Sequence, residues 1–306
     1  MATSLLDDGV ELRRSMFLEF RTAAEDVRQA AADADTSLGR AVHDYRKALR
    51  RGRALLRMIA GELPKADRRD VYRALTDARR SLGPARDHAV ANDVLGQLQG
   101  DEERVLAKTV LDRAAASSMA SSEIKQLLSE GAARTAAQVE LLDAALPPRL
   151  EWRSLLDGVR ATYAEARKAR RDAKDSRRAF HTWRRRSKEL AIQLEILART
   201  TAPQLDELRK QVADANDQLG ETVDLLMARD FVRAHAAEID EDGVDLLESA
   251  LEHDLDDKIR DGRRAGRDAF RRKSRVFARK LAKAVKRDVT PVAAPPLIRS
   301  EEFAMT

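Results

Sequence analysis

Two segments of the sequence carry the same pattern of cationic side chains. The pattern is a His followed by cations three, four and seven positions later. It occurs at His43, Arg46, Lys47 and Arg50, and again 138 residues later at His181, Arg184, Arg185 and Lys188. Arg holds phosphate oxygens with a forked set of donors, and Lys supplies a mobile point charge. The pattern therefore predicts a site for a polyanion.

A second pair of landmarks has nearly the same offset. Leu82-Gly83 followed by Asp87 recurs 137 residues later as Leu219-Gly220 followed by Asp224. Two landmarks at nearly the same offset indicate an internal duplication, in which each half supplies one cationic helix. If a pseudo-two-fold axis passes between these helices, their cationic faces meet in one groove.

Helical geometry separates the side chains of the first copy into two faces. At about 100° per residue, Arg46, Lys47, Arg50, Arg53 and Arg57 fall within about 80° of His43. The opposite half of the helix is apolar, so we expect a buried face and a solvated cationic face. In the second copy Ile192 falls among the cations, which predicts a narrower cationic face.

Charge is strongly segregated along the chain. The net charge of the whole chain is +5, whereas residues 40–57, 160–188 and 258–287 carry about +6, +9 and +12. The rest of the chain therefore carries a net charge of about −22. The three basic segments favour a polyanionic partner. Between Arg46 and Arg57 no acidic residue is present to pair with the cations within the helix.

Periodicity and composition predict an all-α protein of two antiparallel helical bundles related by pseudo-two-fold symmetry. The expected halves are residues 1–148 and 149–288, divided at Pro147-Pro148, and residues 289–306 form a flexible tail. The first half is predicted to hold helices at 9–34, 40–61, 65–82, 85–98, 101–117 and 119–145. The second is predicted to hold helices at 149–172, 176–199, 204–219, 221–237, 241–262 and 264–287.

Several classes of protein are excluded or disfavoured. The chain has no Cys, so disulfides and thiol catalysis are excluded. No apolar run approaches the roughly 18 residues that a membrane span needs, and no signal peptide is recognisable, so we expect a cytoplasmic protein. There is no glycine-rich phosphate loop, and no His or acidic residue stands three or four positions after either motif His, so we expect no enzyme activity, no metal and no cofactor.

These residues resemble a known family. Val42 to Arg53 and Phe180 to Leu190 are similar to the two signature helices of the CHAD family, the conserved histidine α-helical domain. Leu82-Gly83-Pro84-Ala85-Arg86-Asp87 resembles the element that follows its first signature helix, and Gly158 to Tyr163 with Arg167 resembles the opening of its second half. The resemblance extends from about residue 10 to about residue 288.

The resemblance implies two four-helix bundles with a basic central groove or pore that binds inorganic polyphosphate, and association with polyphosphate granules. It also implies the binding residues, which are His43, Arg46, Lys47, Arg50, Arg51, Arg53, Arg57, His181, Arg184, Arg185 and Lys188. Where the family often has Arg-Tyr this chain has Ala191-Ile192, which is expected to shorten the second binding face.

Two other functions remain open at this stage. The same basic faces fit nucleic-acid phosphates, although few Asn, Gln or aromatic side chains accompany them to read or stack bases. A phosphate-processing enzyme would need a carboxylate cluster for Mg²⁺, and the acidic residues of this chain gather elsewhere.

Overall fold

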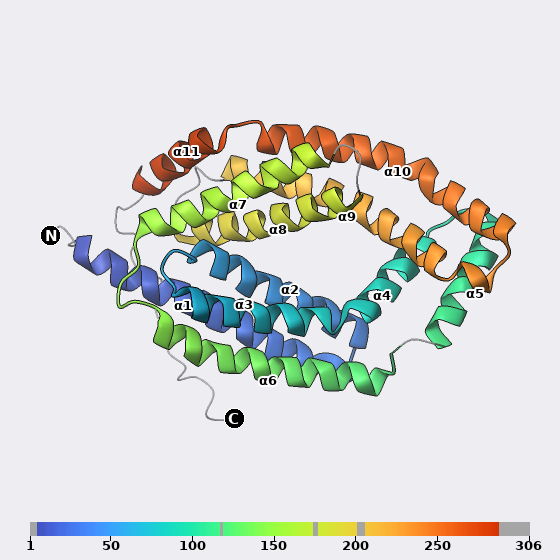
Figure 1. The fold of residues 1–306 in the computed structure, drawn as a ribbon, viewed down its shortest axis with the longest axis horizontal. Helices are drawn as coiled ribbons and strands as arrows, with labels where there is room; N and C mark the ends of the chain where they lie inside the picture. The colour runs from blue at the N-terminus through green and yellow to red at the C-terminus, as the bar shows by residue number, and fades with distance from the viewer. Residues whose placement is uncertain (1–4, 117–118, 174–176, 201–205, 288–306) are drawn as a thin grey trace, which may run out of the picture.

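A computed structural model describes residues 5–116, 119–173, 177–200 and 206–287. This part of the chain is helical and contains no strand, so the predicted all-α fold is confirmed (Figure 1). Within the described residues, no helix is both long and apolar enough to cross a membrane. The predicted tail at 289–306 lies outside the described residues.

The first bundle consists of four helices that contact one another (Figure 1). They are α1 (Leu5–Ala32), α2 (Leu38–Met58), α3 (Lys65–Arg80) and α6 (Ser121–Ala145). A short 3₁₀ turn, Asp33–Asp35, reverses the chain between α1 and α2. Phe20, Tyr45 and Leu75 are almost fully buried between these helices. The apolar face predicted for α2 therefore forms part of the core.

The second bundle is built from helices that follow in sequence. They are α7 (Trp152–Asp172), α8 (Arg177–Thr200), α9 (Asp206–Ala234) and α10 (Glu241–Phe270), with a 3₁₀ turn at Ala236–Glu238. Helix α11 (Ser274–Arg287) packs on α7, where the rings of Phe277 and Tyr163 stack with their centroids 3.9 Å apart.

Helices α4 (Gly83–Leu95) and α5 (Asp101–Ala116) connect the two bundles. Helix α4 packs on α9 and α5 packs on α10. Their contact is a small separate core that includes Leu95, Val110, Val232 and Leu251. Two helices from the first half of the sequence, α4 and α5, thus pack against the second bundle.

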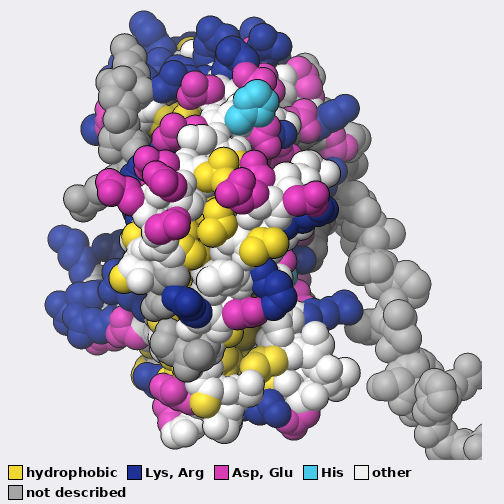
Figure 2. All heavy atoms as spheres, turned by 90° about the vertical axis from the view of Figure 1, so that its right-hand side faces the viewer, with side chains coloured by type: hydrophobic (Ala, Val, Ile, Leu, Met, Phe, Trp, Pro, Cys, Tyr) yellow, Lys and Arg dark blue, Asp and Glu magenta, His cyan; other side chains and the backbone are white. Residues whose placement is uncertain are grey.

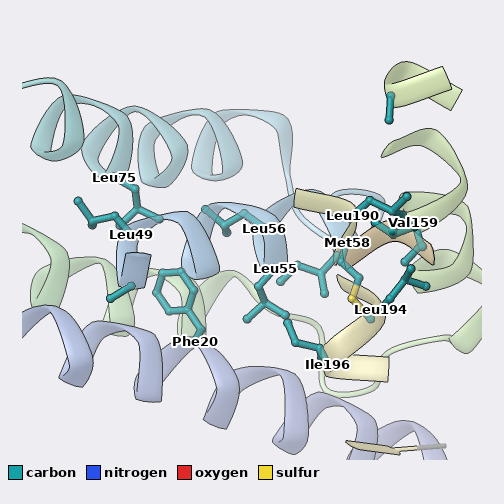
Figure 3. Close-up of a cluster of buried hydrophobic side chains, with 14 of the residues drawn as sticks. Phe20, Leu49, Leu55, Leu56, Met58, Leu75, Val159, Leu190, Leu194 and Ile196 are labelled. Carbon is teal, nitrogen blue, oxygen red and sulfur yellow. The ribbon is translucent and has the colours of Figure 1, made fainter. Parts of the chain in front are cut away.

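The bundles also meet directly, because α2 packs on α7 and α8. Figure 3 shows Leu55 and Met58 of α2 beside Val159, Leu190 and Leu194, and all of these belong to one continuous core. A Cβ atom on Gly158 would lie 2.2 Å from the carbonyl oxygen of Met58. Only glycine therefore allows α7 to approach α2 this closely.

Two predicted helix breaks are wrong, since α9 continues through Gly220 and α10 continues through Gly262 to Phe270. Tertiary packing overrides the local preference of glycine at these positions. A Cβ on Gly262 would stand 3.5 Å from side-chain atoms of Leu219 and Thr222, so this glycine lies where α10 meets α9. In addition, the Thr222 hydroxyl donates a 3.0 Å hydrogen bond to the Lys258 carbonyl across the same contact.

The predicted boundary at Pro147-Pro148 falls between α6, which ends at Ala145, and α7, which begins at Trp152. The internal duplication and the division into two halves stay predictions.

Candidate anion-binding site

Cations from four helices face one another where the two bundles meet. We call them the central cationic cluster, and they are Arg46 and Arg50 of α2, Arg79 of α3, Arg86 of α4, and Arg184 and Lys188 of α8. The sequence patterns supply Arg46, Arg50, Arg184 and Lys188. Contact between α2 and α8 brings the cations of the two patterns together.

Burial and like charges both act on Arg50 and Lys188. Burial, followed by the charges of Arg184 and Arg79, lowers the pKa of Arg50 to about 10. Burial, followed by the charges of Arg184 and Arg50, lowers the pKa of Lys188 to about 7. Like charges and low polarity both disfavour the charged form, and a bound anion would relieve both effects.

Arg46 also donates hydrogen bonds to two backbone carbonyls. Its Nη1 donates to the carbonyl oxygens of Arg79, at 2.9 Å, and Leu82, at 3.2 Å. The Arg79 carbonyl lies in the last turn of α3, where helix carbonyls lack intrahelical partners. The Leu82 carbonyl lies in the turn before α4 and also accepts from the Arg86 N–H at 3.3 Å. Arg46 and Arg50 are half-buried. The expectation of a solvated cationic face is therefore wrong for both, and also for Arg53, which is only 4% exposed.

Each copy of the repeated landmark places a carboxylate beside an arginine of its own pattern. Oδ2 of Asp224 on α9 accepts a hydrogen bond from Arg184 at 3.3 Å, and Oδ1 lies 3.2 Å from Arg184 and 4.0 Å from Arg86. Asp87 of α4 raises the pKa of Arg46 by its charge, against the larger lowering effect of burial. Two carboxylates facing six cations leave the cluster strongly positive.

Arg53 and Arg57 have acidic partners that come from other helices. Arg53 lies 3.6 Å from Glu189 and donates to the Tyr72 hydroxyl at 2.8 Å. Arg57 lies 2.7 Å from Glu165 and 3.4 Å from Glu189.

Glu189 is the centre of this network. Its side chain is 1% exposed, and it also accepts from Arg186 of its own helix at 2.7 Å. A buried carboxylate surrounded by three guanidinium groups fixes the contact between α2 and α8. A role of Arg53 and Arg57 in anion binding stays a prediction.

Arg51 points to a different neighbour. It pairs with Glu19 of α1 and lies 3.3 Å from Glu195 of α8. These pairs raise its pKa in spite of the opposing effect of burial. Its binding role likewise stays a prediction.

The remaining predicted residues lie closer to solvent. His43, Lys47, His181 and Arg185 are exposed. Burial of part of the ring lowers the pKa of His43, and the charges of Arg86 and Arg50 add to this effect. Ile192 is partly buried and packs on the hydrophobic core together with Ala191.

Sequence reasoning did not assign Arg79 and Arg86 to the site. Arg86 belongs to the Leu-Gly-x-x-Arg-Asp element, which could have marked it as a candidate. Arg79 carries no comparable signal, because only the packing of α3 against α2 brings it near Arg50 and Arg53. No group of three His, Asp or Glu side chains that could hold a metal ion occurs among the described residues.

Comparisons with known proteins agree with this architecture. The chain is similar to the crystal structure of the CHAD domain from the plant Ricinus communis, with a TM-score of 0.61 and 18% sequence identity, and the match covers 83% of this chain and 92% of that chain. At this identity the likeness concerns the fold alone. The search of curated proteins found no match. A family model described as the CHAD domain matches residues 19–233, a segment that contains both cationic patterns and is more than half of the chain, and this protein therefore belongs to the CHAD domain family.

Proposed function

We propose that this protein binds inorganic polyphosphate at the central cationic cluster and does not transform it. The observation that carries the proposal is the position of Arg50 and Lys188. Two helices from different bundles hold these like charges near each other, and burial and repulsion lower both pKa values. An arrangement that is unfavourable in the free protein becomes favourable when a polyanion neutralises it.

Polyphosphate suits such a cluster better than a compact ligand does. Each phosphate of the chain carries about one negative charge, so the partner needs many cations along one path. The cluster combines forked guanidinium donors with one ammonium group, and it draws them from four different helices. The CHAD family is known for polyphosphate binding, which favours this ligand.

The side chains around the cluster favour binding without catalysis. The acids beside the cluster, Asp87 and Asp224, are each engaged with an arginine. A hydrolytic site of the two-metal type would need carboxylates grouped around a cation. We also propose that the protein acts in the cytoplasm at polyphosphate granules, where its ligand would be concentrated.

The test compares two pairs of substitutions that change the net charge equally. Arg50→Gln with Arg184→Gln removes two cations of the cluster. Arg28→Gln with Arg209→Gln removes two cations that pair with acids of their own helices, Glu25 at 2.5 Å and Asp206 at 3.1 Å.

Affinity for long-chain polyphosphate is measured by calorimetry at physiological salt, with duplex DNA and single-stranded RNA as competitors. Loss of two charge-assisted contacts should weaken binding by at least about tenfold in the first pair and by less than about twofold in the control. Equal affinity of the unsubstituted protein for polyphosphate and for either nucleic acid would sink the assignment in favour of nucleic-acid binding.

A further inference from the structure

A second group of arginines lies on α7 and α10, apart from the central cationic cluster. It lines an open groove of about 780 Å³, which we call the α7–α10 groove. Its lining residues are Arg170, Arg171 and Ala173 of the α7 end and Asp256, Ile259, Arg260, Arg263 and Arg267 of α10. Figure 2 shows Lys and Arg side chains gathered at the top of the molecule, where Figure 1 places α10 and α11. None of the lining residues belongs to the central cationic cluster.

The two helices bring these side chains together for reasons of packing. Arg260, Arg263 and Arg267 are spaced by three and four residues, so they share one face of α10. Gly266 opens a notch beside them, because a Cβ atom there would lie 2.0 Å from the Trp183 ring and 3.4 Å from Cδ of Arg170. The stem of Arg170 and the Trp183 ring occupy the space that a larger residue would fill.

The charges in this groove are poorly compensated. Arg170 is half-buried, and burial followed by the charges of Arg167 and Arg171 lowers its pKa, to which Arg267 also contributes. Its Nε is buried and makes no hydrogen bond. Within the part of the chain that the structure describes, no carboxylate forms an ion pair with Arg170, Arg171 or Arg267.

The other two lining arginines have partners of their own. Arg260 pairs with the exposed Asp257 of its own helix, and Arg263 lies over the ring of Phe180 at 5.6 Å from its centroid. Among the lining residues Asp256 is the single acid against five arginines. An exposed intrahelical pair of this kind contributes little stability and does not prevent an anion from binding.

The side of α10 that packs on α9 carries a balanced set of charges. Between α9 and α10 a groove of about 480 Å³ contains Arg264 and Arg271 together with three aspartates, Asp214, Asp261 and Asp268. The protein there supplies its own counter-charges. On the α7 side, Arg170, Arg171 and Arg267 form no ion pair with a carboxylate of the described residues, although Arg267 belongs to the same helix.

We propose that the α7–α10 groove is a second anion site that takes a short run of condensed phosphate groups. The choice of ligand class rests on the function proposed above. Guanidinium groups from two helices can each hold two phosphate oxygens, and the anion would supply the missing acceptor for Arg170. The run of phosphates comes either from a free oligophosphate or from a segment of a longer chain.

The test uses two pairs of substitutions on this part of the fold. Arg170→Gln with Arg267→Gln alters the α7–α10 groove. Arg264→Gln with Arg271→Gln alters the acid-lined face of α10 and changes the net charge equally. Both pairs are introduced into the full chain that already carries Arg50→Gln and Arg184→Gln, and tripolyphosphate and long-chain polyphosphate are titrated separately.

The first pair should lower affinity by about tenfold and reduce the slope of log K against log salt by about 1.4, because two phosphate contacts are lost. The control pair should change affinity by less than about twofold. A loss seen with tripolyphosphate assigns the groove to free oligophosphate, and a loss seen only with the long chain assigns it to a chain segment. Equal losses in both pairs, or no loss in the first pair with either ligand, overturn the proposal.

A further pair of substitutions and a comparison with the central substitutions separate the two proposed sites. Arg171→Gln with Arg267→Gln repeats the test with exposed side chains alone, in case Arg170 is needed for folding. If the otherwise unsubstituted protein binds long chains and only the central substitutions weaken that binding, the second site is wrong and the proposed function stands. If Arg170 and Arg267 support tripolyphosphate binding while the central substitutions have no effect on either ligand, the central assignment is wrong and the second site stands.

Discussion

Lys188 should make polyphosphate affinity fall as the pH rises through neutrality. Its ammonium group is half-buried, and burial with the charges of Arg184 and Arg50 lowers its pKa to about 7 in the free protein, against a smaller opposing effect of Asp224. A bound polyanion favours the protonated form and raises the pKa. Binding therefore takes up a proton, and by linkage protons strengthen binding.

The size of the effect follows from this pKa. With a value near 7, the protonated fraction of Lys188 falls from about 0.9 at pH 6 to about 0.1 at pH 8. If the bound form stays protonated throughout, the affinity falls by about tenfold, which is about 1.4 kcal/mol. Proton uptake at pH 7 should be about half a proton per binding event.

The assay is calorimetric titration with long-chain polyphosphate at pH 6, 7 and 8 in buffers of different ionisation heat. Long chains are used because terminal phosphate groups titrate near neutrality and are few in such chains. His43→Gln with His181→Gln provides the background, since an imidazole would titrate in the same direction. Lys188→Arg keeps its charge across this range and should remove most of the pH dependence.

Whereas polyphosphate affinity should fall as the pH rises, the stability of the free protein should increase. The folded-state pKa of Lys188 lies below its usual value of 10.5, so between about pH 7 and that value the unfolded state binds more protons. The free energy of unfolding should therefore rise with pH above about 7, and less so in Lys188→Met. If Lys188→Arg retains the tenfold fall in affinity between pH 6 and 8, another group is responsible and the reasoning is refuted.

Two further predictions concern the contact between the bundles. Glu189→Ala should lower the free energy of unfolding, measured in urea, by roughly 3–5 kcal/mol, because it leaves buried guanidinium groups without a counter-charge. Glu165, whose side chain is 44% exposed, is the control, and Glu165→Ala should cost less than about 1 kcal/mol. Equal losses would contradict the buried network. Gly158→Ala should cost about 1–3 kcal/mol in thermal unfolding, since its Cβ would meet the Met58 carbonyl at 2.2 Å. Gly39→Ala, with no atom within 4 Å of its Cβ, should be neutral or stabilising, and a destabilisation equal to that of Gly158→Ala would show that backbone contact is not the cause.

Much of the fold was predictable because it depends on local patterns. The 3.6-residue period of α2 identifies a buried face, and the Gly and Pro residues around α3 and α4 mark real helix ends. The predicted breaks at Gly220 and near Gly262 failed for a physical reason. A glycine in a helix either ends it or permits a close contact, and only tertiary structure separates the two cases.

The site was predictable in part. Repetition of the cationic pattern identified Arg50 and Lys188, whose proximity then depends on how α2 packs on α8. The partners of the other cations could not be found along one helix. Glu19 lies tens of residues from Arg51, and Glu165 and Glu189 lie more than a hundred residues from Arg57, so no spacing rule along one helix joins these pairs.

The cations of α2 fall into two groups that need each other. Arg53 and Arg57 are paired with carboxylates and hold α2 against α8. Arg50 is held by that contact close to Arg184 and Lys188, where burial and like charges lower its pKa. Since the buried pairs and the core offset this repulsion, the proposed anion site would be preorganised in the free protein. Ligand binding then removes a repulsion already present, and by mass action it should stabilise the folded protein.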